Sequence, residues 1–142
     1  MSLTVRNLNK SIRNIQIIKN INLDVNNGEC LALLGPSGCG KSTTLRCIAG
    51  LEKLNSGEIF LDGNEITNLP ANQRQIGMVF QNYALFPHLD VFSNLSIGLK
   101  VRGVSSPEIK QKVYSIIQIL SLGGLEHRLP AQLSGGQRQR VA

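Results

Sequence analysis

Hydrophobic and polar residues alternate in two stretches near the start of the chain, residues 3–8 and 21–25. A period of two is typical of half-buried β-strands, because successive side chains of a strand point to opposite faces. Residues 30–34 and 76–80 are instead almost wholly apolar, and short runs of this kind predict strands that are buried on both faces. Asn26-Asn27-Gly28 predicts a turn ahead of the first apolar run.

Between the two apolar runs the pattern predicts one helix and one hairpin. The helix covers residues 41–49, with Gly50 as its expected C-terminal cap. Its expected apolar face consists of Leu45, Ile48 and Ala49. Residues 58–61 and 64–67 flank Asp62-Gly63, which is a pair typical of tight hairpin turns.

Strands predominate up to about residue 81, and helical signals predominate from about residue 90. Asp90 is suited to cap a helix over residues 91–100, because its carboxylate accepts a hydrogen bond from a free backbone N–H of the first turn. Ser106-Pro107-Glu108 begins a second helix, with the serine as its cap, and Gly123-Gly124 ends it. The apolar positions of this second helix repeat at helical spacing, at Val113, Ile116, Ile117 and Leu120.

The composition is that of one ordinary globular domain, with 142 residues of which 42% are hydrophobic and 17% charged. The net charge of +6 comes from scattered residues, apart from the pair Arg138 and Arg140, so we expect no nucleic-acid partner. Cys30, Cys39 and Cys47 have neither metal-site nor disulfide spacing, and a reducing cytosol fits them best. The first six residues have no apolar core of the signal-peptide type, and there is no run of about 18 apolar residues, so the chain itself is not expected to span a membrane.

The first strong chemical signal lies between the first apolar run and the first predicted helix. It reads Gly35-Pro36-Ser37-Gly38-Cys39-Gly40-Lys41-Ser42-Thr43 and matches the phosphate-loop pattern G-x-x-x-x-G-K-[ST]. Glycines let backbone N–H groups turn toward an anion, and the helix N-terminus adds further free N–H groups. Lys41 is placed to reach the β- and γ-phosphates, and the Ser42 hydroxyl to bind Mg²⁺. The alternative, a structural glycine turn, does not account for the lysine and the Ser-Thr pair in register.

A second motif near the end of the chain shows which kind of phosphate-loop protein this is. Residues 133–142, LSGGQRQRVA, resemble the signature motif of ATP-binding cassette (ABC) ATPases, and residues 35–63 and 79–99 resemble that family around its phosphate loop and Q-loop. The resemblance covers essentially the whole chain and is closest to importer ATPases of the sugar, polyamine and ferric-iron type. It implies an α/β fold, a P-loop NTPase that is incomplete at the C-terminus. Residues 1–85 would form the RecA-like core with an antiparallel β subdomain, and residues 86–142 the helical subdomain.

The resemblance also implies roles and partners. Lys41 and Gln81 would be catalytic, and Gln81 matches the glutamine that helps Ser42 to hold Mg²⁺, positions the attacking water and senses the γ-phosphate. Ser134-Gly135-Gly136-Gln137 matches residues that contact ATP bound to the other subunit of a head-to-tail dimer, which is either a homodimer or a pair with a second ATPase subunit. The implied cofactors are ATP and Mg²⁺. The implied partners are membrane permease subunits and, indirectly, a solute-binding protein, with the chain peripheral on the cytoplasmic face of the cell membrane.

Residues 83–95 would lie near the groove that receives a coupling helix from a membrane subunit. Ordinary packing between the two subdomains is the alternative interpretation for their apolar side chains. The apolar residues concerned are Leu85, Phe86, Leu89 and Phe92. His88 and His127 have no evident partner in the sequence and are interpreted as surface or packing residues.

The chain departs from the family pattern in two places. Ile12 stands where the family usually has an aromatic residue that stacks on adenine, and no aromatic residue precedes Phe60. A stacking contribution of about 0.5–1.5 kcal/mol is then missing, which leaves base selectivity open. In addition, no apolar strand ending in Asp-Glu follows residues 133–137, so the family's general base and switch histidine are absent. We therefore expect this polypeptide alone to hydrolyse ATP negligibly and to be poorly stable.

The leading hypothesis is an ATP-binding subunit of an ABC importer, which couples ATP binding and hydrolysis to solute transport. Two alternatives stay open: a soluble ABC ATPase, and a truncated nucleotide-binding module without turnover. The transported solute cannot be assigned from the sequence. Cys39 adds a chemical hypothesis, because a bulky adduct on a thiol inside the phosphate loop should block nucleotide binding.

Overall fold

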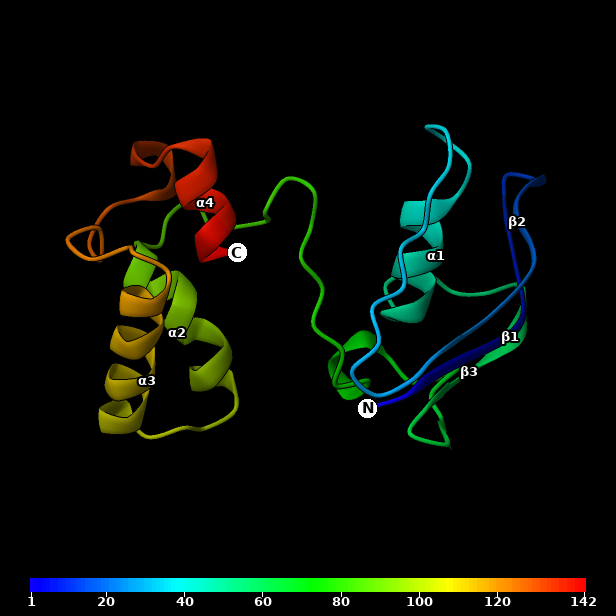
Figure 1. The fold of residues 1–142 in the computed structure, drawn as a ribbon, viewed down its shortest axis with the longest axis horizontal. Coiled ribbons are helices and arrows are strands. Elements are labelled where there is room, and N and C mark those ends of the chain that lie inside the picture. Colours follow the sequence, from blue (N-terminus) through cyan, green and yellow to red (C-terminus); the bar gives the residue numbers. More distant parts are fainter. The chain divides into compact units, whose positions relative to one another are not determined.

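The structure is a computed structural model that describes all of residues 1–142, and it shows two compact units, Met1–Met78 and Val79–Ala142 (Figure 1). Each unit has a hydrophobic core of its own. The functional division expected from the sequence, residues 1–85 and 86–142, stays a prediction. None of the helices combines the length and the apolar character that crossing a membrane requires.

The first unit is built on a four-stranded antiparallel sheet with the strand order β2-β1-β3-β4. β1 (Leu3–Ile12) and β2 (Ile15–Val25) form a long hairpin, and β3 (Ser56–Leu61) and β4 (Asn64–Glu65) form a short one. Asp62-Gly63 joins β3 to β4, and the two residues have φ angles of 49° and 76°. The predicted hairpin is therefore confirmed, but its second strand ends at Glu65 rather than at residue 67.

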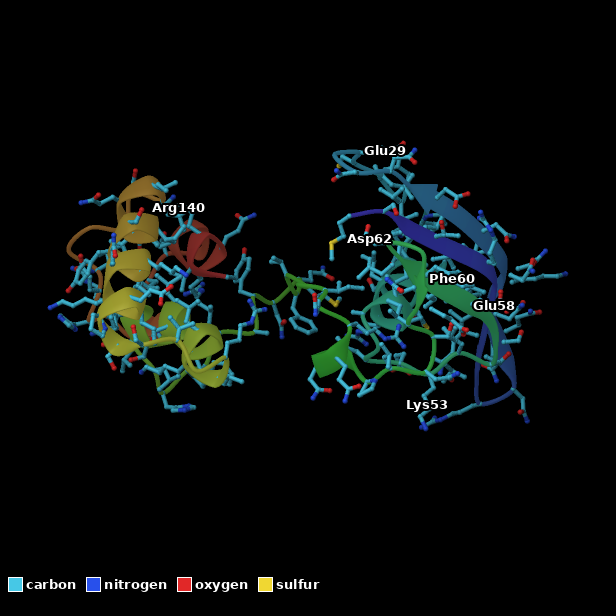
Figure 2. All side chains as sticks on the ribbon, turned by 90° about the horizontal axis from the view of Figure 1, so that it is seen from below. Glu29, Lys53, Glu58, Phe60, Asp62 and Arg140 are labelled. Atoms are coloured by element: carbon cyan, nitrogen blue, oxygen red, sulfur yellow. The ribbon has the colours of Figure 1, made fainter.

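The alternation of side chains along β3 shows how the sheet contributes to the core. Ile59 is fully buried, whereas Glu58 is exposed and Phe60 is half-buried. Figure 2 labels Glu58 and Phe60 along this strand, and Asp62 at the turn that follows it. The buried residues of this core are Val5, Leu8, Ile18, Cys47, Ile48, Ile59 and Ile66.

β1 and β2 are longer than the alternating stretches of the sequence. The alternation stops early because bulges interrupt the pairing of the two strands. Asn7 and Asn20 both have a φ angle of 49°, and the register of the two strands shifts beside them. Side chains satisfy their backbone N–H groups: Asn7 donates to Asn22 Oδ1 and Asn20 donates to Asn9 Oδ1, both at 2.9 Å. A bulge interrupts the period of two, so the alternation in the sequence stops before β1 does.

Helix α1 (Lys41–Ile48) packs against the sheet at the place where the sequence predicted a helix. Its buried residues are Thr44, Cys47 and Ile48. Gly50 follows the helix with a φ angle of 77°, and its N–H donates to the carbonyl of Cys47, which confirms the expected C-terminal glycine. The expectation that Leu45 faces the core is wrong, because Leu45 is 48% exposed.

Two of the predicted strands are wrong. Residues 30–34 and 76–80 have no strand partner, and the sheet consists of β1 to β4 alone. Leu34 is 92% exposed and Val79 is 67% exposed, so neither run is buried on both faces. An apolar run suits a buried strand, but a strand also needs a neighbour that bonds its N–H and C=O groups. No other segment of the chain pairs with these runs.

The second unit is helical and consists of α2 (Val91–Val101), α3 (Ser106–Ile119) and α4 (Gly135–Val141) (Figure 1). A short 3-10 helix, η2 (Pro130–Gln132), precedes α4, and another, η1 (Ala71–Gln73), belongs to the first unit. The buried residues of the second core are Val91, Ile109, Val113, Ile117, Leu122, Leu133 and Val141.

The N-terminus of α2 is held by side-chain and backbone acceptors. Asp90 caps the helix as predicted, and its Oδ1 accepts a hydrogen bond from the Ser93 N–H at 2.8 Å. The first two N–H groups of the helix donate to the carbonyls of Arg128 and Glu126, at 3.0 and 2.9 Å. The free donors of the first turn are therefore satisfied within the unit.

Helix α3 begins and ends earlier than the sequence suggested. Ser105, rather than Ser106, occupies the cap position, and its side chain makes no capping hydrogen bond. The helix ends at Ile119 instead of at Gly123-Gly124, because Ser121 takes the left-handed conformation with a φ angle of 51°. Ile116 is 42% exposed and does not join the buried face. The buried residues of the helix are Ile109, Val113 and Ile117.

We predict that Asp90→Ala destabilises the second unit by about 1 kcal/mol at neutral pH, because the α2 cap is lost. The hydrogen bonds from Ser93 lower the pKa of Asp90. A carboxyl whose pKa is lowered on folding stabilises the protein above its unfolded-state pKa of about 3.9, and this contribution disappears as the pH falls through the folded-state value. Denaturant unfolding at pH 7 and pH 3 measures both effects.

Asp90→Asn is the matched control, because asparagine also caps helices but does not titrate. It should retain most of the stability at pH 7 and lose the pH dependence that Asp90 contributes. An equal difference between wild type and Asp90→Ala at pH 7 and pH 3 would show that the charge of Asp90 does not contribute.

Candidate functional site

The glycine-rich loop ends at the N-terminus of α1, as the sequence predicted. Gly40 occupies the cap position with a φ angle of 96°, and a Cβ added there would lie 3.0 Å from the carbonyl oxygen of Ile17. A side chain at this position would therefore suffer both backbone strain and a close contact. No side chain caps α1, and no acidic residue lies in its first turn. The positive end of the helix dipole is left without an internal partner.

Lys41 lies folded over the loop. Its Nζ donates to the carbonyls of Gly35 and Pro36, both at 2.7 Å, and lies 3.6 Å from the Cys39 Sγ. Ser42 is exposed one residue further along, in the first turn of α1. The loop thus brings one ammonium group, one hydroxyl and free backbone donors together, which is the chemistry that a phosphate group requires.

A depression of about 530 Å³ lies beside this loop within the first unit. It is lined by Gly40 and Lys41 from the loop and by residues of β2 and of the segment before the loop. The aliphatic side chains of its wall are Ile17, Ile18, Ile21, Leu33 and Leu34. No aromatic residue lines it, and Lys19 adds a second positive charge.

The residues of the second motif form a closed capping box at the start of α4. The Ser134 Oγ accepts from the Gln137 N–H at 3.2 Å, and the Gln137 Oε1 accepts from the Ser134 N–H at 2.8 Å. Arg138 donates from Nη1 to the carbonyl of Leu133 at 2.6 Å. Gly135 and Gly136 are exposed. Ser134 is thus the N-terminal cap of α4.

Gln81 is exposed in a turn of the second unit, whereas the phosphate loop belongs to the first unit. The chain around it is bent, since Tyr83 and Ala84 have φ angles of 65° and 49°. No group of three or more His, Cys, Asp or Glu side chains suited to a metal ion occurs in the structure. The metal-binding and catalytic roles of Gln81 and the metal-binding role of Ser42 stay predictions.

Several side chains have contacts that the sequence did not reveal. His127 is exposed, with Nδ1 3.4 Å from the Asp90 Oδ2, and His88 packs edge-to-face on Phe86 with ring centroids 6.1 Å apart. The interpretation of both histidines as surface or packing residues is therefore confirmed, although their neighbours could not be read from the sequence. Asn94 donates from Nδ2 to the carbonyls of Phe86, Leu89 and Asp90, at 3.2, 2.8 and 3.0 Å. It thereby holds the shape of the segment that leads into α2.

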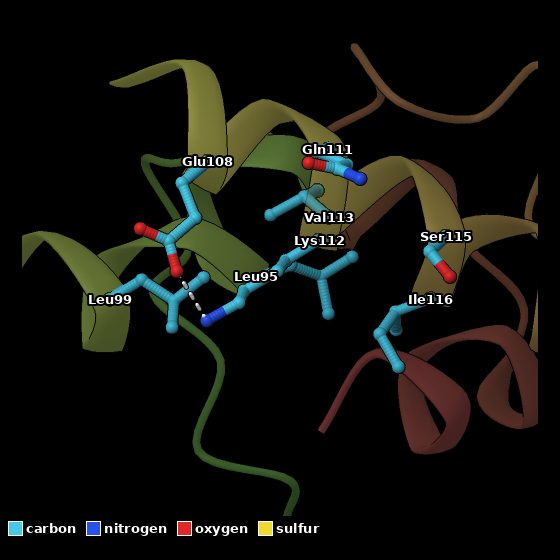
Figure 3. Close-up of a pocket in the computed structure, with 8 residues that line it drawn as sticks. All are labelled: Leu95, Leu99, Glu108, Gln111, Lys112, Val113, Ser115 and Ile116. Carbon is cyan, nitrogen blue, oxygen red and sulfur yellow. Dashed lines mark ion pairs between the residues drawn. The ribbon is translucent and has the colours of Figure 1, made fainter. Parts of the chain in front are cut away.

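The four apolar residues expected near a coupling groove differ in exposure. Leu85 and Phe92 pack against the core of the second unit, Leu89 is half-buried, and Phe86 is 45% exposed. A separate apolar groove of about 860 Å³ lies on α2 and α3 (Figure 3). Leu95 and Leu99 line it, and an ion pair between Glu108 and Lys112 at 2.8 Å lies at its edge.

A glycine-rich loop that ends in Lys-Ser at the start of a sheet-packed helix defines the phosphate site of a P-loop NTPase. The sequence profile described as "ABC transporter" matches residues 18–142, and the chain belongs to this family. A dimeric structure of a bacterial ABC transporter cassette superposes with a TM-score of 0.88, and a dimeric ATP-binding cassette in a post-hydrolysis state, bound to ADP and Pi, with 0.85. Each is 32% identical and covers 98% of this chain and 66% of that chain. The fold class is therefore confirmed.

Three curated relatives show the importer type that the resemblance suggested. The spermidine/putrescine import ATP-binding protein PotA of Aggregatibacter actinomycetemcomitans is 51% identical over 97% of this chain. The maltose/maltodextrin import ATP-binding protein MalK of Aliivibrio fischeri is 51% identical over 99%, and the Fe(3+) ions import ATP-binding protein FbpC of Brucella abortus is 49% identical over 99%. The chain spans 37% of the length of PotA, 38% of MalK and 40% of FbpC.

We predict that alkylation of Cys39 by N-ethylmaleimide abolishes nucleotide binding. Cys30 and Cys39 are exposed, whereas Cys47 is buried, so Cys30→Ser leaves Cys39 as the one accessible thiol. Burial also raises the pKa of Cys47, which keeps this thiol unreactive. Fluorescence titration with a methylanthraniloyl derivative of ATP measures binding before and after labelling, and ATP should slow the labelling. Unchanged binding by the labelled protein, with no protection by ATP, would show that the thiol lies outside the nucleotide site.

Proposed function

We propose that the chain is the nucleotide-binding part of an ABC importer ATPase, which couples ATP binding and hydrolysis to solute transport across a membrane. The observation that carries this proposal is the uncapped N-terminus of α1 behind a loop that contains Lys41. The printed names of the curated relatives, all import ATP-binding proteins, support the importer type. The names differ in solute, so no solute is assigned here.

In this proposal the loop residues 35–43 hold the triphosphate of ATP. The free N–H groups at the start of α1 bind phosphate oxygens, and Lys41 exchanges its bonds to loop carbonyls for bonds to the β- and γ-phosphates. Ser42 and Gln81 would hold Mg²⁺, which neutralises phosphate charge when it is bound. Gln81 would also orient the attacking water.

The second motif and the relatives support the proposed partners. Ser134-Gly135-Gly136-Gln137 would contact ATP held by another ATPase subunit in a head-to-tail dimer, and the dimeric cassette structures support an assembly of this kind. Permease subunits in the membrane would bind the pair, which would place the chain on the cytoplasmic face of the membrane, with a solute-binding protein as an indirect partner. Co-purification with an integral membrane protein distinguishes this proposal from a soluble ABC ATPase.

The 142 residues alone are proposed to bind ATP without appreciable turnover. Phosphoryl transfer to water needs an oriented water molecule and a group that accepts its proton. The phosphate loop supplies charge and positioning, but no strand ending in Asp-Glu occurs in the chain. A nucleotide-binding module without turnover is therefore the second candidate for this polypeptide by itself.

We predict that Lys41→Ala weakens binding of the fluorescent ATP derivative by at least about tenfold, because a charge-assisted contact to phosphate is lost. Lys110→Ala is the charge-matched control, since Lys110 is exposed on α3 in the other unit. It should bind as the wild type does. Steady ATP turnover by the chain alone, abolished by Lys41→Ala, would contradict the proposed lack of turnover. Equal binding by both variants would contradict the proposed site.

We also predict weak selectivity for adenine, with ATP and GTP competing within about threefold of each other. The depression beside the loop is lined by aliphatic side chains, and Ile12 ends β1 where the family usually has an aromatic residue. Ile12→Tyr should strengthen ATP binding about two- to tenfold by stacking. Ile15→Tyr, at the residue paired with Ile12 across the hairpin, is the control. A strong preference of the wild type for ATP in competition titrations would show that another part of the site recognises adenine.

A further inference from the structure

Arg74 is a buried cation whose charge faces backbone carbonyls. It follows η1 in the first unit, and only 4% of its surface is exposed. Burial lowers the pKa of Arg74, but a guanidinium remains protonated in proteins. A charge removed from water needs compensating contacts. The position of this side chain is therefore set by the groups that its donors reach.

Those groups come from two separate parts of the chain. Nη1 donates to the carbonyls of Cys47 and Ile48, both at 2.9 Å. Nε donates to the Leu69 carbonyl at 2.8 Å, and Nη2 to the Thr67 carbonyl at 2.6 Å. One side chain thus joins the last turn of α1 to the segment after β4.

The segment after β4 is itself anchored to the sheet. The Thr67 Oγ1 accepts from the Ile59 N–H at 2.9 Å, and the Ile66 N–H donates to the Ile59 carbonyl at 2.8 Å. Ile59 lies in β3 and is fully buried. Arg74 therefore connects the C-terminal end of α1 to the sheet through bonds that are separate from the hydrophobic contacts of the helix.

Gly50 provides the space that this arrangement needs. It has a φ angle of 77°, and a Cβ added there would lie 2.5 Å from the Arg74 Nε and 2.9 Å from its Cδ. Any side chain at position 50 must therefore displace the guanidinium. Gly63 has nearly the same φ angle, 76°, but nothing lies within 4 Å of an added Cβ. The two glycines differ in whether Arg74 lies against them.

We propose that Arg74 is a positioning residue for the phosphate site: it holds the C-terminal end of α1, and thereby the direction of the N-terminal turn that carries Lys41 and Ser42. The inference rests on the proposed nucleotide site. A helix of this length is about 12 Å long, so a tilt of about 10° displaces its far end by about 2 Å. Displacements of that size are large compared with the tolerance of a hydrogen-bonded site.

The test compares Gly50→Ala with Gly63→Ala in the whole chain. Both place alanine at a positive φ angle, so both carry similar backbone strain, but only Gly50→Ala displaces Arg74. Binding of the fluorescent ATP derivative is measured at a temperature where circular dichroism shows each variant to be folded. We expect about tenfold weaker binding for Gly50→Ala and for Arg74→Met, and wild-type binding for Gly63→Ala. The double variant Gly50→Ala/Arg74→Met should bind no more weakly than Arg74→Met alone.

Amide hydrogen exchange of residues 37–44 gives a second readout that does not require nucleotide. Exchange should be faster in Gly50→Ala and Arg74→Met than in Gly63→Ala. Variants that lose thermal stability but keep wild-type binding and wild-type exchange in this segment would overturn the proposal, since Arg74 would then act on folding alone. A folded wild type that does not bind ATP would contradict the proposed function, while the exchange comparison would still decide the role of Arg74.

Discussion

The packing of α1 on the antiparallel sheet is the contact on which both the fold of the first unit and its candidate site depend. The helix has 8 residues, and isolated helices of this length are marginal in water. Cys47 is fully buried and Ile48 is 7% exposed, and burying a side chain such as isoleucine stabilises by about 1.5–3 kcal/mol. The helix is therefore stable where the sheet holds it. The positions of Lys41 and Ser42 consequently depend on a sheet that lies outside the phosphate loop.

The two ends of this helix differ in how their free backbone groups are satisfied. At the C-terminus, Arg74 and the Gly50 N–H bond the last carbonyls. At the N-terminus, Gly40 offers no side-chain cap, and the first turn has no acidic residue. Free N–H groups and the positive dipole end favour an anion. The last carbonyls of α1 are thus hydrogen-bonded within the chain, whereas its first N–H groups are free. This difference favours a negative group at the N-terminus of the helix.

Sequence reasoning succeeded where the cause of a feature lies within a few residues. Asp90 caps α2 by bonding an N–H three residues further along, and such spacing can be read directly from the sequence. The apolar run over residues 30–34 misled, because a strand depends on a partner that local composition does not reveal. Arg74 escaped notice because its acceptors lie up to 27 residues away. Only the folded chain brings them together.

Ser134 caps α4, and in the proposed dimer it also contacts the nucleotide of a second chain. The capping box shows which atoms of its hydroxyl group are available for the second role. Its Oγ accepts a hydrogen bond from the Gln137 N–H, which uses an acceptor lone pair and leaves the hydroxyl hydrogen free to donate. Gln137, in contrast, has its Oε1 committed to the Ser134 N–H. The serine can therefore hold the helix start and donate to a phosphate oxygen of a partner's nucleotide at the same time. Capping and the proposed contact across a dimer are compatible because they use different parts of one hydroxyl group.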